Sequence, residues 1–247
     1  MTAIVLALMA GAGVGLALGA LGGGGSVLAV PALIYLLGFS PSAATTASLI
    51  IVATTSATAL YAHARDGHVA WKTGSLFTAA GIIPAYLAGA AAGRVPAATL
   101  TITFSVVAAL AAVRMFRPSS SRPPKRIRPG KSAAAGAGLG AVTGFLGVGG
   151  GFLAVPALVS VLGLTMRRAV GTSLLVITVN SLAALVARTG TGDGLDWALI
   201  GPFTGAAILG AWDGKRLSTK VSGDTLQKAF AGVLLAVAVF MLIDVIV

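Results

Sequence analysis

Apolar residues occur along this chain in long runs separated by short polar turns. Ten runs can be recognised, and each is expected to be a helix because an open strand cannot satisfy its backbone hydrogen bonds in lipid. The runs lie near 3–21, 26–38, 43–63, 71–93, 97–116, 133–146, 151–163, 168–187, 197–213 and 224–246. The pattern predicts an all-α polytopic membrane protein.

The first five runs and the last five are related in sequence. Residues 21–60 laid on 146–185 give about 18 identities in 40 positions without a gap, too many for two unrelated apolar helices. After one inserted residue, Trp71 aligns with Trp197. The sequence therefore predicts two transmembrane repeats, a duplication typical of transporters. The predicted parts are a first repeat at 1–116, a linker at 117–132 and a second repeat at 133–247.

Composition supports a membrane location and narrows the chemistry. Hydrophobic residues make up 57% of the chain and charged residues 9%, against about a quarter charged in a soluble domain. The chain has no cysteine, which excludes disulfides and thiolate metal sites. No cofactor is expected.

The net charge of +11 is interpreted as a topology signal and not as a sign of nucleic-acid binding. Seven of the 17 Lys and Arg residues lie between Arg114 and Lys131, in a Pro-rich stretch expected to be non-helical and cytoplasmic. If the first two runs of each half form a hairpin, most other basic loops also face the cytoplasm. Each half then crosses the membrane an odd number of times, which predicts inverted repeats with both termini outside.

Clustered glycines join the first two runs of each half. The run after each cluster has about 13 residues, roughly 20 Å of helix, which is too short for a hydrocarbon core of about 30 Å. Broken or re-entrant hairpins are expected, with tips that meet near the midplane and expose free helix amides to an anion. The predicted substrate-binding residues of these tips are Gly22, Gly24, Gly25, Ser26, Gly147, Gly149, Gly150 and Gly151.

A second class of glycine recurs every four residues in the first run of each half. This spacing of small residues is typical of close helix packing, so no binding role is assigned to it. The members are Gly11, Gly15, Gly19, Gly136, Gly140 and Gly144.

Polar residues recur at matched positions in the third run of each half. Ser48 and Thr55 align with Ser173 and Asn180, and each pair is seven residues apart, on one helix face. Thr172 adds a hydroxyl in the second half. These five residues complete the predicted site; hydrogen bonding within or between helices is the alternative for each hydroxyl.

Two histidines lie at the end of the third run. His63 and His68 are expected to be solvated loop residues. No Asp lies at the centre of an apolar run, although ion-coupled pumps usually keep an ionisable residue at depth.

The repeated glycine segments carry a resemblance to a known family. Leu21–Leu33 and Leu146–Leu158, each followed by a Ser-Leu pair, resemble the sulfite exporter TauE/SafE family of bacterial permeases. Val170-Gly-Thr-Ser-Leu174 is close to the usual motif, whereas Thr46-Ala-Ser-Leu49 departs from it. The segments that end at Trp71 and Trp197 also resemble the family, although Ala70 replaces an Asp in the first half.

The resemblance implies a secondary transporter, and not an enzyme, that exports sulfite, organosulfonates or similar small sulfur-containing anions across the bacterial cytoplasmic membrane. An uptake permease or anion channel for another small anion is the alternative. An intramembrane enzyme that uses Ser26 with His63 is a third hypothesis, disfavoured because the two residues are predicted at different depths. The expected partners are a small anionic substrate and membrane lipid, without nucleic acid; the sequence leaves homo-oligomer formation open.

Overall fold

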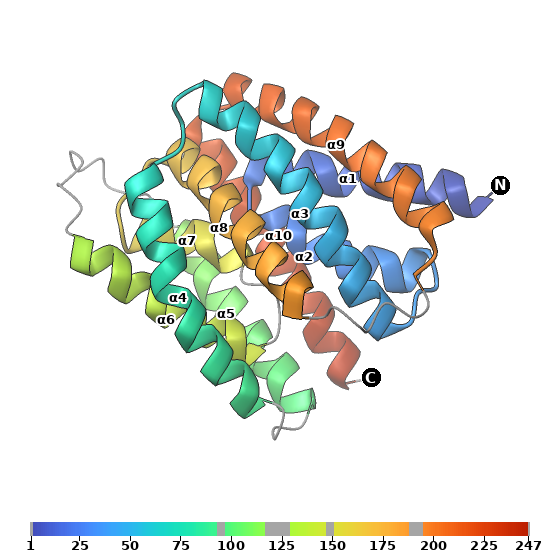
Figure 1. Cartoon of the computed structure of the whole chain (residues 1–247), viewed down its shortest axis with the longest axis horizontal. Coiled ribbons are helices and arrows are strands. Elements are labelled where there is room, and N and C mark those ends of the chain that lie inside the picture. The colour runs from blue at the N-terminus through green and yellow to red at the C-terminus, as the bar shows by residue number, and fades with distance from the viewer. Residues whose placement is uncertain (1, 93–96, 117–128, 147–150, 188–194, 247) are drawn as a thin grey trace.

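The described residues of the protein form a bundle of α-helices (Figure 1). The computed structural model describes residues 2–92, 97–116, 129–146, 151–187 and 195–246. They contain no β-strand, which confirms the all-α prediction. In the first half the elements are α1 (Thr2–Leu21), α2 (Gly24–Pro31), the π-helical segment η1 (Ala32–Leu36), α3 (Pro41–Arg65), α4 (Trp71–Ala92) and α5 (Ala97–Phe116). In the second half they are α6 (Pro129–Leu146), α7 (Gly151–Ser160), α8 (Met166–Ala187), α9 (Trp197–Lys220) and α10 (Gly223–Ile246).

Helix length agrees with a membrane protein that contains broken helices. Within the described segments, four helices are long and apolar enough to cross a membrane: Thr2–Leu21, Ala43–Arg65, Met166–Val186 and Gly223–Ile243. By contrast, α2 has 8 residues and α7 has 10, so neither can span a hydrocarbon core at 1.5 Å per residue.

Two helices extend into segments where no helix was expected. α6 begins at Pro129, inside the predicted linker, because a proline at the first helical position needs no amide hydrogen. α9 continues from the expected end at residue 213 to Lys220. Its last two turns are polar, so hydrophobicity alone did not reveal them, and Lys215 there pairs with Asp66 at 2.7 Å.

Helices of one half pack mainly on helices of the other half. α1 lies along α9, and α6 lies along α4 (Figure 1). These two pairs are equivalent under exchange of the halves, because α1 corresponds to α6 and α4 to α9. Two further pairs, α3 with α8 and α5 with α10, join equivalent helices directly. The halves are therefore interlocked.

The glycines spaced four residues apart in α1 and α6 make the close contacts of α1 with α9 and of α6 with α4 possible. A Cβ added at Gly11, Gly15 or Gly19 would collide with the backbone of α9, and one at Gly136 or Gly140 would collide with the backbone of α4. The α9 backbone groups met are those of Phe203, Ala207 and Ala211, and the α4 groups are those of Phe77 and Gly81. The prediction that these five glycines serve close helix packing is confirmed.

Helices α3 and α8 run antiparallel where they cross. The Ser56 and Thr178 hydroxyls lie 2.9 Å apart. Seven residues later in α3, His63 lies beside Gly171, which is seven residues earlier in α8: a Cβ at Gly171 would be 3.4 Å from the Cβ of His63. Antiparallel equivalent helices are what inverted repeats require. The orientation of the halves in a membrane stays a prediction.

Candidate functional site

The first glycine tip lies against α8 of the other half. Gly22 ends α1 with a φ of +69°, a left-handed conformation that favours glycine, and its amide donates to the Leu18 carbonyl at 2.8 Å. A Cβ at Gly22 would lie 2.5 Å from the Ser173 Oγ and 3.2 Å from the Val170 carbonyl oxygen. The structure thus brings together Gly22 and Ser173, two predicted site residues that are 151 positions apart (173 minus 22).

Part of the tip is occupied by its own hydrogen bonds. The Gly25 amide donates to the Gly22 carbonyl at 3.3 Å. The Ser26 hydroxyl donates to the Gly23 carbonyl at 2.7 Å. The amide of Gly25, which was expected to be free, is therefore paired, and Gly24 begins α2 directly after the turn.

The second glycine tip lies largely outside the described residues. This holds for Gly147, Gly149 and Gly150, while Gly151 begins α7. α2 and α7, the helices that follow the two tips, contact each other. Whether the tips themselves meet stays a prediction.

Three of the predicted hydroxyls use backbone partners. Ser48 donates to the Thr45 carbonyl at 2.8 Å, and its equivalent Ser173 donates to the Val170 carbonyl at 2.8 Å. Thr172 accepts a hydrogen bond of 3.0 Å from the Ala70 amide, which precedes α4. All three are buried. Their hydrogen bonds agree with the structural alternative considered for each, although a hydroxyl oxygen can form more than one bond.

Thr55 is the exception among these hydroxyls. Its residue is 0% exposed, and its Oγ1 has no hydrogen-bond partner in the part of the chain that the structure describes. Its neighbours Thr54 and Thr58 instead donate to carbonyls four residues earlier, at 2.8 and 2.6 Å. A buried hydroxyl without a partner is destabilising by about 1–3 kcal/mol, so Thr55 has an unused donor at the centre of the bundle.

A polar contact between α3 and α8 lies next to Thr55 in the sequence. Ser56, the next residue, bonds to Thr178 of α8, and Ser181 on the following turn of α8 is also buried. Asn180, the equivalent of Thr55, is half-buried. Ser56 and Thr178 were not among the predicted site residues. Ser56 aligns with Ser181 and was therefore a further matched polar position, whereas Thr178 aligns with Ala53 and had no such signal.

His63 is buried and not a solvated loop residue, which corrects the prediction made for it. It is 3% exposed, and its Nε2 lies 3.1 Å from the Gly19 carbonyl oxygen. A carbonyl only accepts, so Nε2 is the donor. Gly19 lies within the last four residues of α1, whose carbonyls have no partner in their own helix. His63 therefore caps α1 just before the first tip. Its seven-residue spacing from Ser56 was the available sequence signal.

Metal binding and serine catalysis find no support in the geometry. No group of three or more His, Asp or Glu side chains that could hold a metal occurs within the described ranges. The Ser26 hydroxyl and the His63 Nε2 each donate to a different carbonyl, so neither is arranged to activate the other.

The first tip and the buried hydroxyls occupy different levels of the bundle. Gly22 lies beside the start of α8, at the level of His63. Seven residues of helix, about 10 Å, separate that level from the contact between Ser56 and Thr178. The described candidate site is therefore a path along the α3–α8 interface, with Gly22 and Ser173 at one end and the contact of Ser56 with Thr178 further in; apolar Ala59 and Leu174 lie between these two levels.

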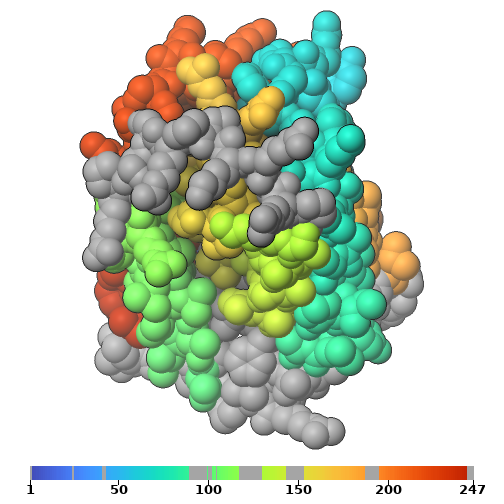
Figure 2. All heavy atoms as spheres, turned by 90° about the vertical axis from the view of Figure 1, so that its left-hand side faces the viewer, coloured from blue at the N-terminus to red at the C-terminus, as the bar shows by residue number. Residues whose placement is uncertain are grey.

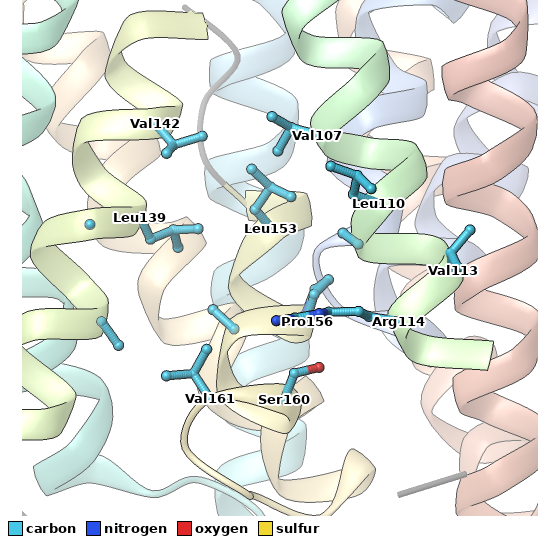
Figure 3. Close-up of a pocket in the computed structure, with 14 residues that line it drawn as sticks. Val107, Leu110, Val113, Arg114, Leu139, Val142, Leu153, Pro156, Ser160 and Val161 are labelled. Atoms are coloured by element: carbon cyan, nitrogen blue, oxygen red, sulfur yellow. The ribbon is translucent and has the colours of Figure 1, made fainter. Parts of the chain in front are cut away.

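An apolar groove of about 650 Å³ lies apart from this path, between α5, α6 and α7 (Figure 3). Among the described residues, none of the predicted site residues lines it. The face on which these three helices lie is seen in Figure 2, with α5 and α6 at the surface.

Comparisons with known proteins agree with one another. The family model described as "Sulfite exporter TauE/SafE" matches residues 7–241. Two proteins named "Probable membrane transporter protein", from two strains of Xylella fastidiosa, are 31% and 30% identical to the chain over 248 aligned positions. Each alignment covers 97% of this chain and 95% of the relative. No solved structure matches the chain.

Proposed function

Because this chain belongs to the sulfite exporter TauE/SafE family, a membrane transporter family, we propose that it is a secondary transporter that exports small sulfur-containing anions such as sulfite or organosulfonates. The protein is a multi-pass protein of the bacterial cytoplasmic membrane. Export of an anion needs no coupling ion, since an inside-negative potential favours it by about 2.3 kcal/mol per charge per 100 mV.

The unpartnered hydroxyl of Thr55 is the observation that carries the site proposal. A small oxyanion accepts hydrogen bonds on all sides, and hydroxyl donors at the interface of two helices can replace its water shell without a buried cation. Thr55 supplies such a buried donor on α3, next in sequence to Ser56, which contacts α8. The amides of Gly22 and Gly25 are paired within the first tip, so we assign the oxyanion to the other amides of the tips, where glycine leaves no side chain in between.

Replacement of Thr55 tests this site. Thr55→Val keeps the shape of the side chain and removes its hydroxyl. We expect flux of radiolabelled sulfite from proteoliposomes to fall at least about tenfold, while the melting temperature stays the same or rises, because an unpartnered buried hydroxyl is lost. Thr58→Val is the matched control: its hydroxyl is exposed and bonds within α3. Unchanged flux in Thr55→Val would refute the role of Thr55.

The glycine tips are tested separately. We expect Gly24→Val and Gly150→Val to abolish flux more than folding, because each adds a side chain between the amides and the anion. Wild-type flux in both variants, at normal expression, would rule out the tips as the site.

The substrate and mode of transport need their own measurement. Sulfite and sulfonate flux equal to that of empty vesicles would refute the substrate proposal. Voltage-dependent currents far above transporter turnover would instead favour an anion channel, and inward flux against the expected gradient would favour an uptake permease.

A further inference from the structure

The groove between α5, α6 and α7 is apolar along most of its length and cationic at one end. Leu110 of α5, Leu139 and Val142 of α6 and Leu153 of α7 line its apolar part. Arg114 and Ser160 also line it. Figure 3 shows the Arg114 side chain extending from α5 toward α7, where Pro156 and Ser160 lie. A cation is thus placed at the end of a channel-like apolar surface.

The place related to this groove by exchange of the two halves has a different chemistry. The gapless alignment pairs Ser160 with Tyr35. The offset that pairs Trp71 with Trp197 pairs Arg114 with Phe240. Tyr35 and Phe240 are in contact, with ring centroids 5.5 Å apart and planes at 89°. An aromatic pair therefore joins η1 to α10, whereas the equivalent positions of α7 and α5 have a hydroxyl and a guanidinium.

The charge of Arg114 is unbalanced. It forms no ion pair with any carboxylate among the described residues. It lies in the last turn of α5, immediately before the basic linker, so the cationic end of the groove is on the linker side of the protein. Toward the other end the lining is aliphatic, with Val107 and Val142 (Figure 3).

We propose that this groove binds one anionic phospholipid, with an acyl chain along the apolar part and the phosphate on Arg114 and Ser160. Each part of the lipid meets matching chemistry: hydrocarbon against Leu and Val, phosphate against a guanidinium and a hydroxyl. The apolar lining faces a lipid environment in which such a chain is always available. The proposal depends on the membrane location and not on which anion is transported.

Native mass spectrometry of the full-length protein in mild detergent tests the proposal. The probes are phosphatidylglycerol and phosphatidylcholine with identical acyl chains. We expect the wild type to retain one phosphatidylglycerol at least about fivefold more tightly than phosphatidylcholine, and Arg114→Gln to lose this preference. The matched control is Lys72→Gln, which removes an exposed positive charge from the first turn of α4, outside the groove.

A second variant reports on the groove itself. Arg114→Phe combined with Ser160→Tyr copies the aromatic pair of Tyr35 and Phe240 and should abolish tight binding of both lipids at an unchanged melting temperature. Equal retention of the two lipids by the wild type would overturn the proposal, as would full phosphatidylglycerol retention in the double variant. A lipid-free dimer that dissociates in the double variant would also overturn it and would identify a second copy as the occupant.

Discussion

His63 connects two helices through one hydrogen bond. It comes from the last turns of α3 and donates to a carbonyl at the end of α1, beside the turn at Gly22. Its Nδ1 is buried without a partner among the described residues. The burial of His63 was difficult to predict from sequence, because histidine is also common in solvated loops. The residues around His63 do not indicate that α1, which is distant in sequence, packs against it.

Loss of this donor should destabilise the protein. We expect His63→Leu to reduce the free energy of unfolding by about 1–3 kcal/mol, since the Gly19 carbonyl stays buried, and His63→Gln to have a smaller effect because it keeps an N–H donor. Thermal unfolding in detergent measures this. His68→Gln, at the half-buried histidine, serves as control and should have little effect.

The ion pair of Asp66 and Lys215 gives a pH dependence with a defined sign. A hydrogen bond from Lys215 holds the pKa of the Asp66 carboxyl below its usual value. Since the carboxylate is favoured in the folded state, the pair contributes stability above the ordinary pKa near about 3.9, and this stability is lost as pH falls through the lower folded value. The contribution is at most about 1 kcal/mol, because the pair is partly exposed.

We therefore expect the melting temperature to fall between about pH 5 and pH 3 less steeply in Asp66→Asn than in the wild type. Identical slopes in wild type and Asp66→Asn would show that the pair does not contribute.

At the scale of elements, hydrophobic runs predicted the helices well and their ends less well. The starts of α4 and α5 and the end of α1 agree with the prediction. The misplaced ends have polar sequences, as in the last two turns of α9, or begin with a proline, as in α6. Tertiary contacts stabilise such helix ends, and these contacts cannot be predicted from the pattern of apolar residues.

Close packing of α1 on α9 makes two glycines of one helix respond oppositely to the same change. Gly15→Ala should destabilise the protein by about 1–3 kcal/mol or prevent folding, because the added Cβ collides with the Ala207 backbone. Gly13→Ala should be neutral or stabilising by up to about 1 kcal/mol, because nothing lies within 4 Å of its Cβ position. Unfolding curves of the two variants compare them directly; a similar loss in both would contradict the packing assignment.

At the scale of the whole molecule, the repeat explains what could be predicted of the site. The aligned motifs predicted that Gly22 and Ser173 belong to one binding site, and the structure places these two residues next to each other. The repeat could not indicate the pair Ser56 and Thr178, because that contact joins positions that are not equivalent. It also could not indicate which buried hydroxyl lacks a partner, since this depends on distances between helices.

The absence of cysteine permits a direct test of topology. Single substitutions Thr2→Cys and Ser120→Cys introduce the only thiol in each chain. With the linker cytoplasmic, we expect a membrane-impermeant maleimide to label Ser120→Cys in inside-out vesicles only and Thr2→Cys in right-side-out vesicles only. Labelling of both variants from the same side would exclude the predicted inverted arrangement.

The pairing of α1 with α9 has a consequence during synthesis. Gly11 meets Phe203, so 192 residues (203 minus 11) separate the two sides of this contact along the chain. At about 5–20 residues per second, the ribosome needs roughly 10–40 s to supply the partner of a helix that has already left it. During that time the glycine row of α1 faces lipid or an insertion chaperone. The newly made first half is therefore an intermediate whose packing is completed only after α9 has been synthesised.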